Sequence, residues 1–354
     1  MLVTEEVMMT GDKSIRATLP SFSIILETEN LTNADIEGLS KSLASLLNQD
    51  ISPTCANEVL LIDSGDVSAE LLEQLCDRYP WIKIHSAPPD TGYYKAKMLG
   101  AQVATGEILV YCDSDCIYEP HWLGTLLATF CQKEHIQIVA GETTTRGVGP
   151  YGTAMALTYI FPQYSGEQAP TPTTQYFLNN VAFRRQFLLD NPIPIDLPLY
   201  RGNCAIHAHE LLQTGYTIWK QPQARATHAP PNGLSHFFWR FLLIGHDYYW
   251  QNRLLAKPNS EIGNQKNLAV SFPGDLPNAA TGSQSIAGQG KMQIFFERIG
   301  RMVKNDPRHR IYLPFAIPIA LTSVTLIFVG YLLTSIQPNL LLKVYDRVLE
   351  SSLG

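Results

Sequence analysis

The sequence has no excess of basic residues. Its 354 residues include 26 lysines and arginines against 32 aspartates and glutamates, which gives a formal net charge of −6 at pH 7. A protein that holds a nucleic-acid backbone needs clustered positive charge to neutralise the phosphates. We therefore expect no nucleic-acid partner.

Cysteine pairs with metal-binding spacing are also absent. The six cysteines form no CxxC pair, and no pair of histidines accompanies them at the spacing of a zinc site. The first 20 residues contain acidic side chains and lack the apolar stretch of a secretory signal. We therefore expect a reducing compartment, with the main domain in the cytoplasm.

One long apolar run without charge is present near the C-terminus. Residues 311–336 contain no charged side chain, and about 20 apolar residues suffice to cross a bilayer. This predicts a transmembrane helix at 311–337 as a single anchor, followed by a tail at 338–354. More lysines and arginines precede the run than follow it, so the large domain is expected on the cytoplasmic side. A buried core helix is the alternative, since Pro314 and Pro318 weaken a simple spanning helix.

Three further segments differ from the rest in composition. Residues 1–20 form a polar leader, and residues 257–290 are rich in Gly, Pro, Ser, Asn and Gln, which is typical of a flexible loop. Residues 291–310 place apolar and basic side chains at helical spacing. This predicts an amphipathic helix at a membrane interface.

Residues 21–256 have the pattern of an α/β domain. Apolar runs of strand length, such as "SFSIILE", "EVLLID" and "EILVYC", alternate with stretches of helical periodicity. Such alternation predicts a largely parallel sheet with helices on its faces. Ligands bind these sheets at the carboxyl ends of the strands. Carboxylates follow three of the expected strands, namely Glu27, Glu29, Asp63, Asp113 and Asp115.

The two aspartates in "VYCDSDC" have three interpretations. Asp113 and Asp115 suit a hard divalent cation that binds a substrate diphosphate. Alternatively, the first aspartate is a phosphatase nucleophile of the haloacid dehalogenase type, although Ile117 stands where that family has Thr. The third interpretation is a pair of solvated turn residues.

The segment from Ser21 to Leu123 resembles the inverting glycosyltransferases of family 2. These enzymes have a GT-A fold, a Rossmann-like domain that binds nucleotide-diphospho-sugars. The stretches that carry the resemblance are "SIILETEN", "VLLIDSGD" and "TGYYKAKMLGAQVATGEILVYCDSD". The last stretch, which runs into the D-x-D, is the most specific.

The resemblance implies roles for individual residues. Glu27 and Thr28 would line the nucleoside site, and Asp63 would accept a hydrogen bond from the base. Lys97 would pair with Asp63 or with the donor phosphates. Asp113 would contact the ribose or the metal, and Asp115 would ligate a metal, Mn²⁺ or Mg²⁺, that bridges the diphosphate. Solvated turn or helix positions are the alternatives for Asp63 and Lys97.

The second half of the domain resembles the family less closely. Asn179 and Asn180, in "YFLNNVAF", would contact the sugars on the acceptor side. His228, in "ARATHAPP", would complete the metal shell, and a neutral imidazole suits Mn²⁺ better than Mg²⁺. The alternative for His228 is an ordinary loop residue. Arg240, in "HFFWRFL", either binds the diphosphate or belongs to a helix that packs against the domain or the membrane.

The sequence departs from the family where the catalytic base is expected. The usual acidic pair falls at Asn203 and Cys204, and neither is a useful base for a sugar hydroxyl at neutral pH. Asp196 and Glu210 are the nearest carboxylates that could replace it. A solvated helix position is the alternative for Glu210.

These features together predict a membrane-anchored hexosyltransferase. It would move a sugar from a nucleotide donor, UDP-linked in our interpretation, to a lipid-linked or surface-polysaccharide acceptor with inversion. The alternative is a non-catalytic protein that binds nucleotide sugars at the membrane as a scaffold or regulator, because the acidic pair is missing.

Overall fold

A computed structural model describes most of the chain. The described residues are 19–29, 36–65, 67–89, 91–132, 135–256 and 291–353. The predicted polar leader lies outside them apart from Leu19 and Pro20, and the predicted loop at 257–290 lies wholly outside them.

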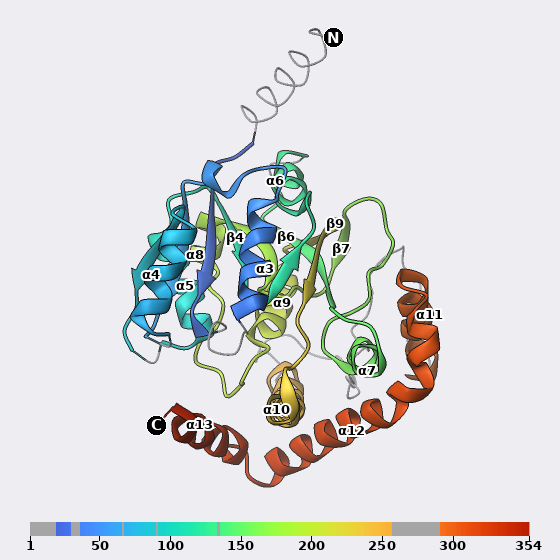
Figure 1. Cartoon of the computed structure of the whole chain (residues 1–354). Coiled ribbons are helices and arrows are strands. Elements are labelled where there is room, and N and C mark those ends of the chain that lie inside the picture. Colours follow the sequence, from blue (N-terminus) through green and yellow to red (C-terminus); the bar gives the residue numbers. More distant parts are fainter. Residues whose placement is uncertain are drawn as a thin grey trace.

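The described part of the chain folds around one mixed sheet of nine strands (Figure 1). The strand order is β3-β2-β1-β4-β8-β6-β9-β5, and β7 pairs with β9. The strands are β1 (Phe22–Glu27), β2 (Glu58–Asp63), β3 (Ile82–Ser86), β4 (Ile108–Cys112), β5 (Cys116–Tyr118), β6 (Ile138–Thr145), β7 (Thr171–Thr173), β8 (Asn180–Arg184) and β9 (Ile218–His228). Strands β1 to β4 pair in parallel, whereas β8 is antiparallel to both of its neighbours.

Helices cover both faces of the sheet, as the alternating pattern predicts. One face packs against α3 (Ile36–Leu47), α4 (Ala69–Arg78) and α6 (Trp122–Gln132). The other face packs against α5 (Tyr93–Val103), α8 (Arg185–Asp190) and α9 (Asn203–Gln213). Side chains of β1 alternate between the two cores, with Ile24 on the first side and Ile25 on the second. The period of two along the strand therefore divides the apolar residues between two layers.

A third group of helices lies below the sheet and to its right in Figure 1. These helices are α7 (Pro150–Thr158), α10 (Gly233–Leu255), α11 (Lys291–Asn305), α12 (His309–Ile336) and α13 (Leu340–Leu353). Helix α12 contains the predicted transmembrane run, and within the described residues it alone is long and apolar enough to cross a bilayer. It does not stand apart from the domain as a simple spanning anchor would. It runs beneath α7 and α10 and packs against both helices.

The contact between α10 and α12 depends on two glycines. A Cβ atom on Gly330 would come within 2.0 Å of the carbonyl oxygen of Leu242, and one on Gly245 within 2.0 Å of the carbonyl oxygen of Ile327. The backbones therefore approach each other more closely than any other residue type permits.

Replacing Gly330 with Ala is expected to destabilise the protein by roughly 1–3 kcal/mol, because the added methyl group forces the two helices apart. Thermal or chemical unfolding in detergent measures this effect. Gly300 on α11 provides the control, since a Cβ there meets nothing within 4 Å. Gly300→Ala should leave stability unchanged or raise it by up to about 1 kcal/mol through helix propensity. Equal effects of the two substitutions would contradict the close crossing.

Candidate functional site

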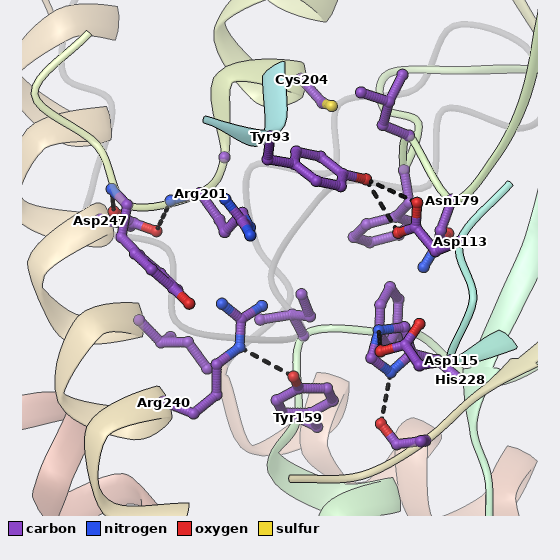
Figure 2. A pocket seen from close by; sticks show the side chains of 18 of the residues that line it. Tyr93, Asp113, Asp115, Tyr159, Asn179, Arg201, Cys204, His228, Arg240 and Asp247 are labelled. Atoms are coloured by element: carbon purple, nitrogen blue, oxygen red, sulfur yellow. Dashed lines mark hydrogen bonds and ion pairs between the residues drawn. The ribbon is translucent and has the colours of Figure 1, made fainter. Parts of the chain in front are cut away.

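A cavity of about 240 Å³ opens at the carboxyl end of β4, between the sheet and α10. The loop after β4 contributes Asp113 and Asp115, β9 ends at His228, and α10 contributes Arg240 and Asp247. Figure 2 shows these side chains around one central space. The cavity thus lies at the sheet edge where the sequence predicts ligand binding.

Asp113 is held in place by two buried partners. The Nζ atom of Lys97 lies 2.7 Å from Oδ1 of Asp113, and the hydroxyl of Tyr93 donates to Oδ2 at 2.9 Å. Lys97 also donates to the carbonyl oxygen of Cys112 at 2.6 Å, and its side chain is fully buried. The predicted pairing of Lys97 with Asp63 is therefore wrong, because Lys97 pairs with Asp113 beneath the cavity. Its contact with donor phosphates stays a prediction.

Asp115 and His228 lie next to each other in the cavity wall. Oδ2 of Asp115 lies 3.1 Å from Nε2 of His228, and both side chains are partly exposed to the cavity. Strand pairing explains the approach, because Cys116 on β5 is opposite His228 on β9. The other ring nitrogen, Nδ1, faces the carbonyl oxygen of Ala229. This contact favours a proton on Nδ1 and directs Nε2 toward the carboxylate.

The atoms around this pair suit a divalent cation. The carboxylate of Asp115, the imidazole of His228 and the thiol of Cys116 have ligand atoms within 4.8 Å of one another. Burial raises the pKa of the Cys116 thiol well above its usual range, so this sulfur stays protonated and is a poor ligand. Burial also raises the pKa of Asp115, and a nearby cation offsets that cost. An oxygen and an imidazole nitrogen form a donor set that fits Mn²⁺.

Three arginines also line the cavity. Arg201 and Arg240 point into it in Figure 2, and Arg146 also lines it. Nη1 of Arg146 is buried and has no hydrogen-bond partner among the described residues. A buried guanidinium nitrogen without a partner is costly, so this position is suited to an anionic ligand.

The loop that carries Arg201 is fixed by carboxylates. Asp247 on α10 accepts hydrogen bonds from the backbone N–H of Tyr200 at 2.7 Å and of Arg201 at 2.9 Å. The guanidinium of Arg201 lies 3.0 Å from Oε1 of Glu29 and 4.3 Å from the centroid of the Tyr93 ring. These contacts pre-organise the arginine beside the cavity.

Arg240 is positioned by an aromatic residue. Its Nε donates to the hydroxyl of Tyr159 at 2.9 Å. Tyr159 and Phe161 also lie beside the ring of His228, with centroid distances of 6.1 Å and 4.6 Å. The segment that includes Tyr159 and Phe161 therefore connects the arginine on α10 with the histidine of the candidate metal site.

The predicted nucleoside residues lie at the ends of β1 and β2. Thr28 is buried, and its hydroxyl accepts a hydrogen bond from the N–H of Ser64 at 3.3 Å. Asp63 accepts one from the N–H of Gly65 at 3.2 Å. Glu27 is 1% exposed, and burial raises its pKa to about 8 although Lys97 opposes this. None of these three predicted residues lines the cavity, and their binding roles stay predictions.

The two predicted acceptor-side asparagines have different environments. Asn179 lines the cavity, and its Oδ1 accepts a hydrogen bond from Thr143 at 3.2 Å. The amide of Asn180 is fully used inside the protein. It accepts from Nε1 of Trp122 at 2.7 Å and donates to two backbone carbonyls. The prediction of a sugar contact at Asn180 is therefore wrong.

Both predicted bases lie outside the cavity. The side chain of Asp196 is 83% exposed and lies 3.6 Å from Lys95, and Glu210 is exposed on α9. Neither residue lines the cavity, so their roles as bases stay predictions that this cavity does not support. At the position of the family's acidic pair, Cys204 does line the cavity, and burial raises the pKa of its thiol to about 11.

Sequence reasoning missed three residues of the site, namely Tyr93, Arg201 and Asp247. Tyr93 lies inside a quoted motif, and a tyrosine one helical turn before Lys97 was an available signal. Arg201 and Asp247 carry no local signature, because their roles depend on a loop packing against α10.

The environment of Asp247 predicts a pH dependence of stability. Burial raises its pKa to about 7, against about 4 in the unfolded chain. Between these values the folded protein holds a proton that unfolding releases, so stability falls as the pH rises, by up to about 1.4 kcal/mol per pH unit. Denaturant titrations at pH 5 and pH 7 should show this fall in the native protein and a smaller one in Asp247→Asn. Equal falls would contradict the raised pKa.

Comparison with known proteins identifies the class of fold. The structure of the mannosyltransferase PcManGT from Pyrobaculum calidifontis, solved with GDP-Man and Mn²⁺, aligns with a TM-score of 0.50 at 15% identity. The alignment covers 92% of this chain and 83% of that chain. The predicted GT-A-like α/β fold is thereby confirmed.

Part of the sequence matches a known family model. The family model described as "Glycosyl transferase family 2" matches residues 31–194. Human polypeptide N-acetylgalactosaminyltransferase 10 is 32% identical over 120 residues, 33% of this chain and 19% of that protein. Chondroitin synthase from Pasteurella multocida is 26% identical over 174 residues, 49% of this chain and 17% of that protein. The chain thus spans about a fifth of these relatives, and residues 31–194 match a family 2 glycosyltransferase domain.

Proposed function

We propose that the chain is a metal-dependent glycosyltransferase that takes a hexose from a nucleotide donor, UDP-linked, and transfers it with inversion. The observation that carries this proposal is the approach of Asp115 and His228 within a cavity lined by arginines. A pair of metal ligands beside guanidinium groups is suited to a diphosphate. The names of the relatives, which describe an N-acetylgalactosaminyltransferase and a chondroitin synthase, support sugar transfer.

The residues that line or support the cavity would have separate roles in this reaction. Asp115 and His228 would hold Mn²⁺ or Mg²⁺, which neutralises charge on the leaving nucleoside diphosphate. Arg201 and Arg240 stabilise the same charge from the opposite side of the cavity. Lys97 and Tyr93 fix Asp113 at the end of β4, where it can accept hydrogen bonds from the donor.

The base for the acceptor hydroxyl must come from the cavity. The described carboxylates that line it are Asp113, Asp115 and Asp247. Asp113 is paired with Lys97, and Asp115 belongs to the metal site. Asp247 is the remaining carboxylate, and a pKa of about 7 suits a general base. We assign it this role in place of Asp196 and Glu210.

The acceptor is proposed to be lipid-linked or part of a surface polysaccharide. Part of the cavity wall is apolar and comes from Ile160, Phe161 and Ile244. Ile160, Phe161 and Ile244 also belong to the apolar cluster that joins α7, α10 and α12. An acceptor with a lipid tail would therefore reach the cavity from the side of the apolar helix α12.

A second candidate function is a non-catalytic protein that binds nucleotide sugars. Asn203 and Cys204 favour it, because they stand where the family's acidic pair is expected and offer no base. In this case the donor would bind with its metal and would not be turned over.

One experiment separates the two functions. The purified full chain is incubated with a panel of UDP- and GDP-sugars, Mn²⁺ and membrane lipid extract, and free nucleoside diphosphate is measured. Transfer predicts release that falls at least tenfold in Asp247→Asn and not in the exposed control Asp196→Asn. Donor binding without release on any acceptor would favour the scaffold. If the chain showed no donor binding and no release, both functions would be refuted.

A further inference from the structure

Helix α12 has an outer face that is unsuited to water. Its exposed side chains are mostly apolar and include Ile311 at 69%, Phe315 at 65%, Leu321 at 62%, Phe328 at 53% and Ile336 at 76% exposure. A soluble protein rarely leaves so long an apolar stripe open to solvent.

The inner face of α12 is the more polar one. His309 forms a hydrogen bond with the hydroxyl of Thr153 at 2.8 Å, and Thr334 forms one with His246 at 3.1 Å. Ser323 is fully buried on the same face. The helix therefore buries these three polar side chains against the protein, whereas its outer face is mostly apolar. This is the reverse of a helix on a water-soluble domain and is suited to a hydrocarbon environment.

The segment before α12 is tied to the catalytic domain. Arg298 on α11 is buried, and its guanidinium donates to the carbonyl oxygens of Ala156, Tyr159 and Phe161 at 2.7–2.9 Å. These carbonyls lie at and just beyond the end of α7, beside the cavity. Helix α11 therefore packs on the domain and does not lead away from it.

The segment after α12 returns to the same domain. Leu341 on α13 is buried against residues of α10. The hydroxyl of Tyr345 lies 3.2 Å from that of Tyr200, which lines the cavity, and the Tyr345 ring lies 5.6 Å from Trp239. In Figure 1, α11 and α13 lie at the two ends of α12, with the domain between them.

These contacts are incompatible with a helix that crosses the bilayer. A helix of 28 residues is about 42 Å long, so crossing a hydrocarbon core of about 30 Å would place α11 and α13 on opposite sides of the membrane. Crossing would also carry α10, with Arg240 and Asp247, into the hydrocarbon. Charged groups at that depth are costly.

We propose that α12 lies in the plane of one leaflet, with its outer face in the acyl chains and its inner face on α7 and α10. The exposed basic side chains of Lys304 and Arg310, at the end of α11 and the start of α12, would face lipid headgroups. The tail at 338–354 then stays on the side of the catalytic domain. This replaces the crossing that composition alone predicts, and it does not depend on the proposed transfer.

Topology gives the first test. Lys343 on α13 and Lys83 on β3 are both exposed, so each is replaced by Cys in the full chain with Cys55→Ser and Cys131→Ser. The protein is added to preformed sealed vesicles of phosphatidylcholine and phosphatidylglycerol and treated with a membrane-impermeant maleimide. The proposal predicts equal labelling of both positions before and after detergent. Protection of K343C until detergent is added would overturn it, and so would failure to sediment with the vesicles.

Depth gives the second test. Nitroxide labels are placed at Ile311, Val324 and Ile336, all exposed on α12. The ratio of their relaxation by oxygen to their relaxation by a water-soluble nickel complex reports the depth of each label in the membrane. An in-plane helix predicts similar depths for the three labels. A crossing helix predicts a central label about 15 Å deeper than the two outer ones, half the hydrocarbon thickness. That second result would overturn the proposal even if labelling of the cysteines were equal.

Discussion

Asp115→Asn is expected to weaken Mn²⁺ binding by at least about 100-fold, since even outer-shell changes at metal sites cost about 10–100-fold. The substitution removes the negative ligand that faces Nε2 of His228 at 3.1 Å. It keeps the size of the side chain, so the loop after β4 should keep its conformation. Titration of Mn²⁺, followed by the loss of its free EPR signal, measures the affinity.

The exposed residue Asp196 provides the control for this prediction. Asp196→Asn removes the same charge on a side chain that is 83% exposed and is not part of the cavity lining. It should leave the affinity unchanged. A similar loss of Mn²⁺ affinity in both variants, or no loss in either, would mean that the metal is bound elsewhere.

Lys97→Met is expected to lower the free energy of unfolding by about 3–5 kcal/mol, the cost of removing one partner of a buried ion pair. Lys97 is fully buried, and the carboxylate of Asp113 that it pairs with is nearly so. Glu27 lies in the same buried group and would lose its neighbouring cation as well. Denaturant titration in detergent at pH 7 measures this loss.

Lys95 is the matched control, since it lies two residues before Lys97 on the same helix and is 54% exposed. Lys95→Met breaks only a surface pair with Asp196, so it should change stability by no more than about 1 kcal/mol. If Lys97→Met were equally mild, the buried charge pair would have no structural importance.

The sequence predicts the first half of the fold well for a physical reason. In the parallel part of the sheet, each strand is a short apolar run and each helix has a clear period, so strands β1 to β4 and the helices between them could be located. Strands β5 and β7 have three residues each, too few for a pattern. Helix α7 is buried on nearly all sides, and its sequence therefore carries no period that marks it as a helix.

The candidate site is predictable only where one motif carries it. Asp113 and Asp115 follow directly from the apolar run of β4. His228 was linked to them by resemblance, and the structure places it beside Asp115 through the pairing of β5 with β9. Asp196 and Glu210 do not line the cavity, because distance along the chain does not determine which loop reaches it. Asp247, which we propose in their place, comes from a helix for which the sequence analysis considered only Arg240.

The C-terminal helix shows what composition leaves open. An uncharged run of sufficient length predicts contact with lipid, but the same run can cross a bilayer or lie along it. Arg298 and Tyr345, on either side of α12, distinguish these arrangements through contacts that no local pattern contains.

The central claim is that Asp115 and His228 hold the cation that binds the donor diphosphate. Anomalous diffraction from crystals grown with Mn²⁺ and UDP tests it most directly. The account predicts one manganese peak within about 2.3 Å of a carboxylate oxygen of Asp115 and of Nε2 of His228, with the diphosphate between it and Arg240. A manganese peak at other residues, or UDP bound in the cavity with no metal at this pair, would contradict it.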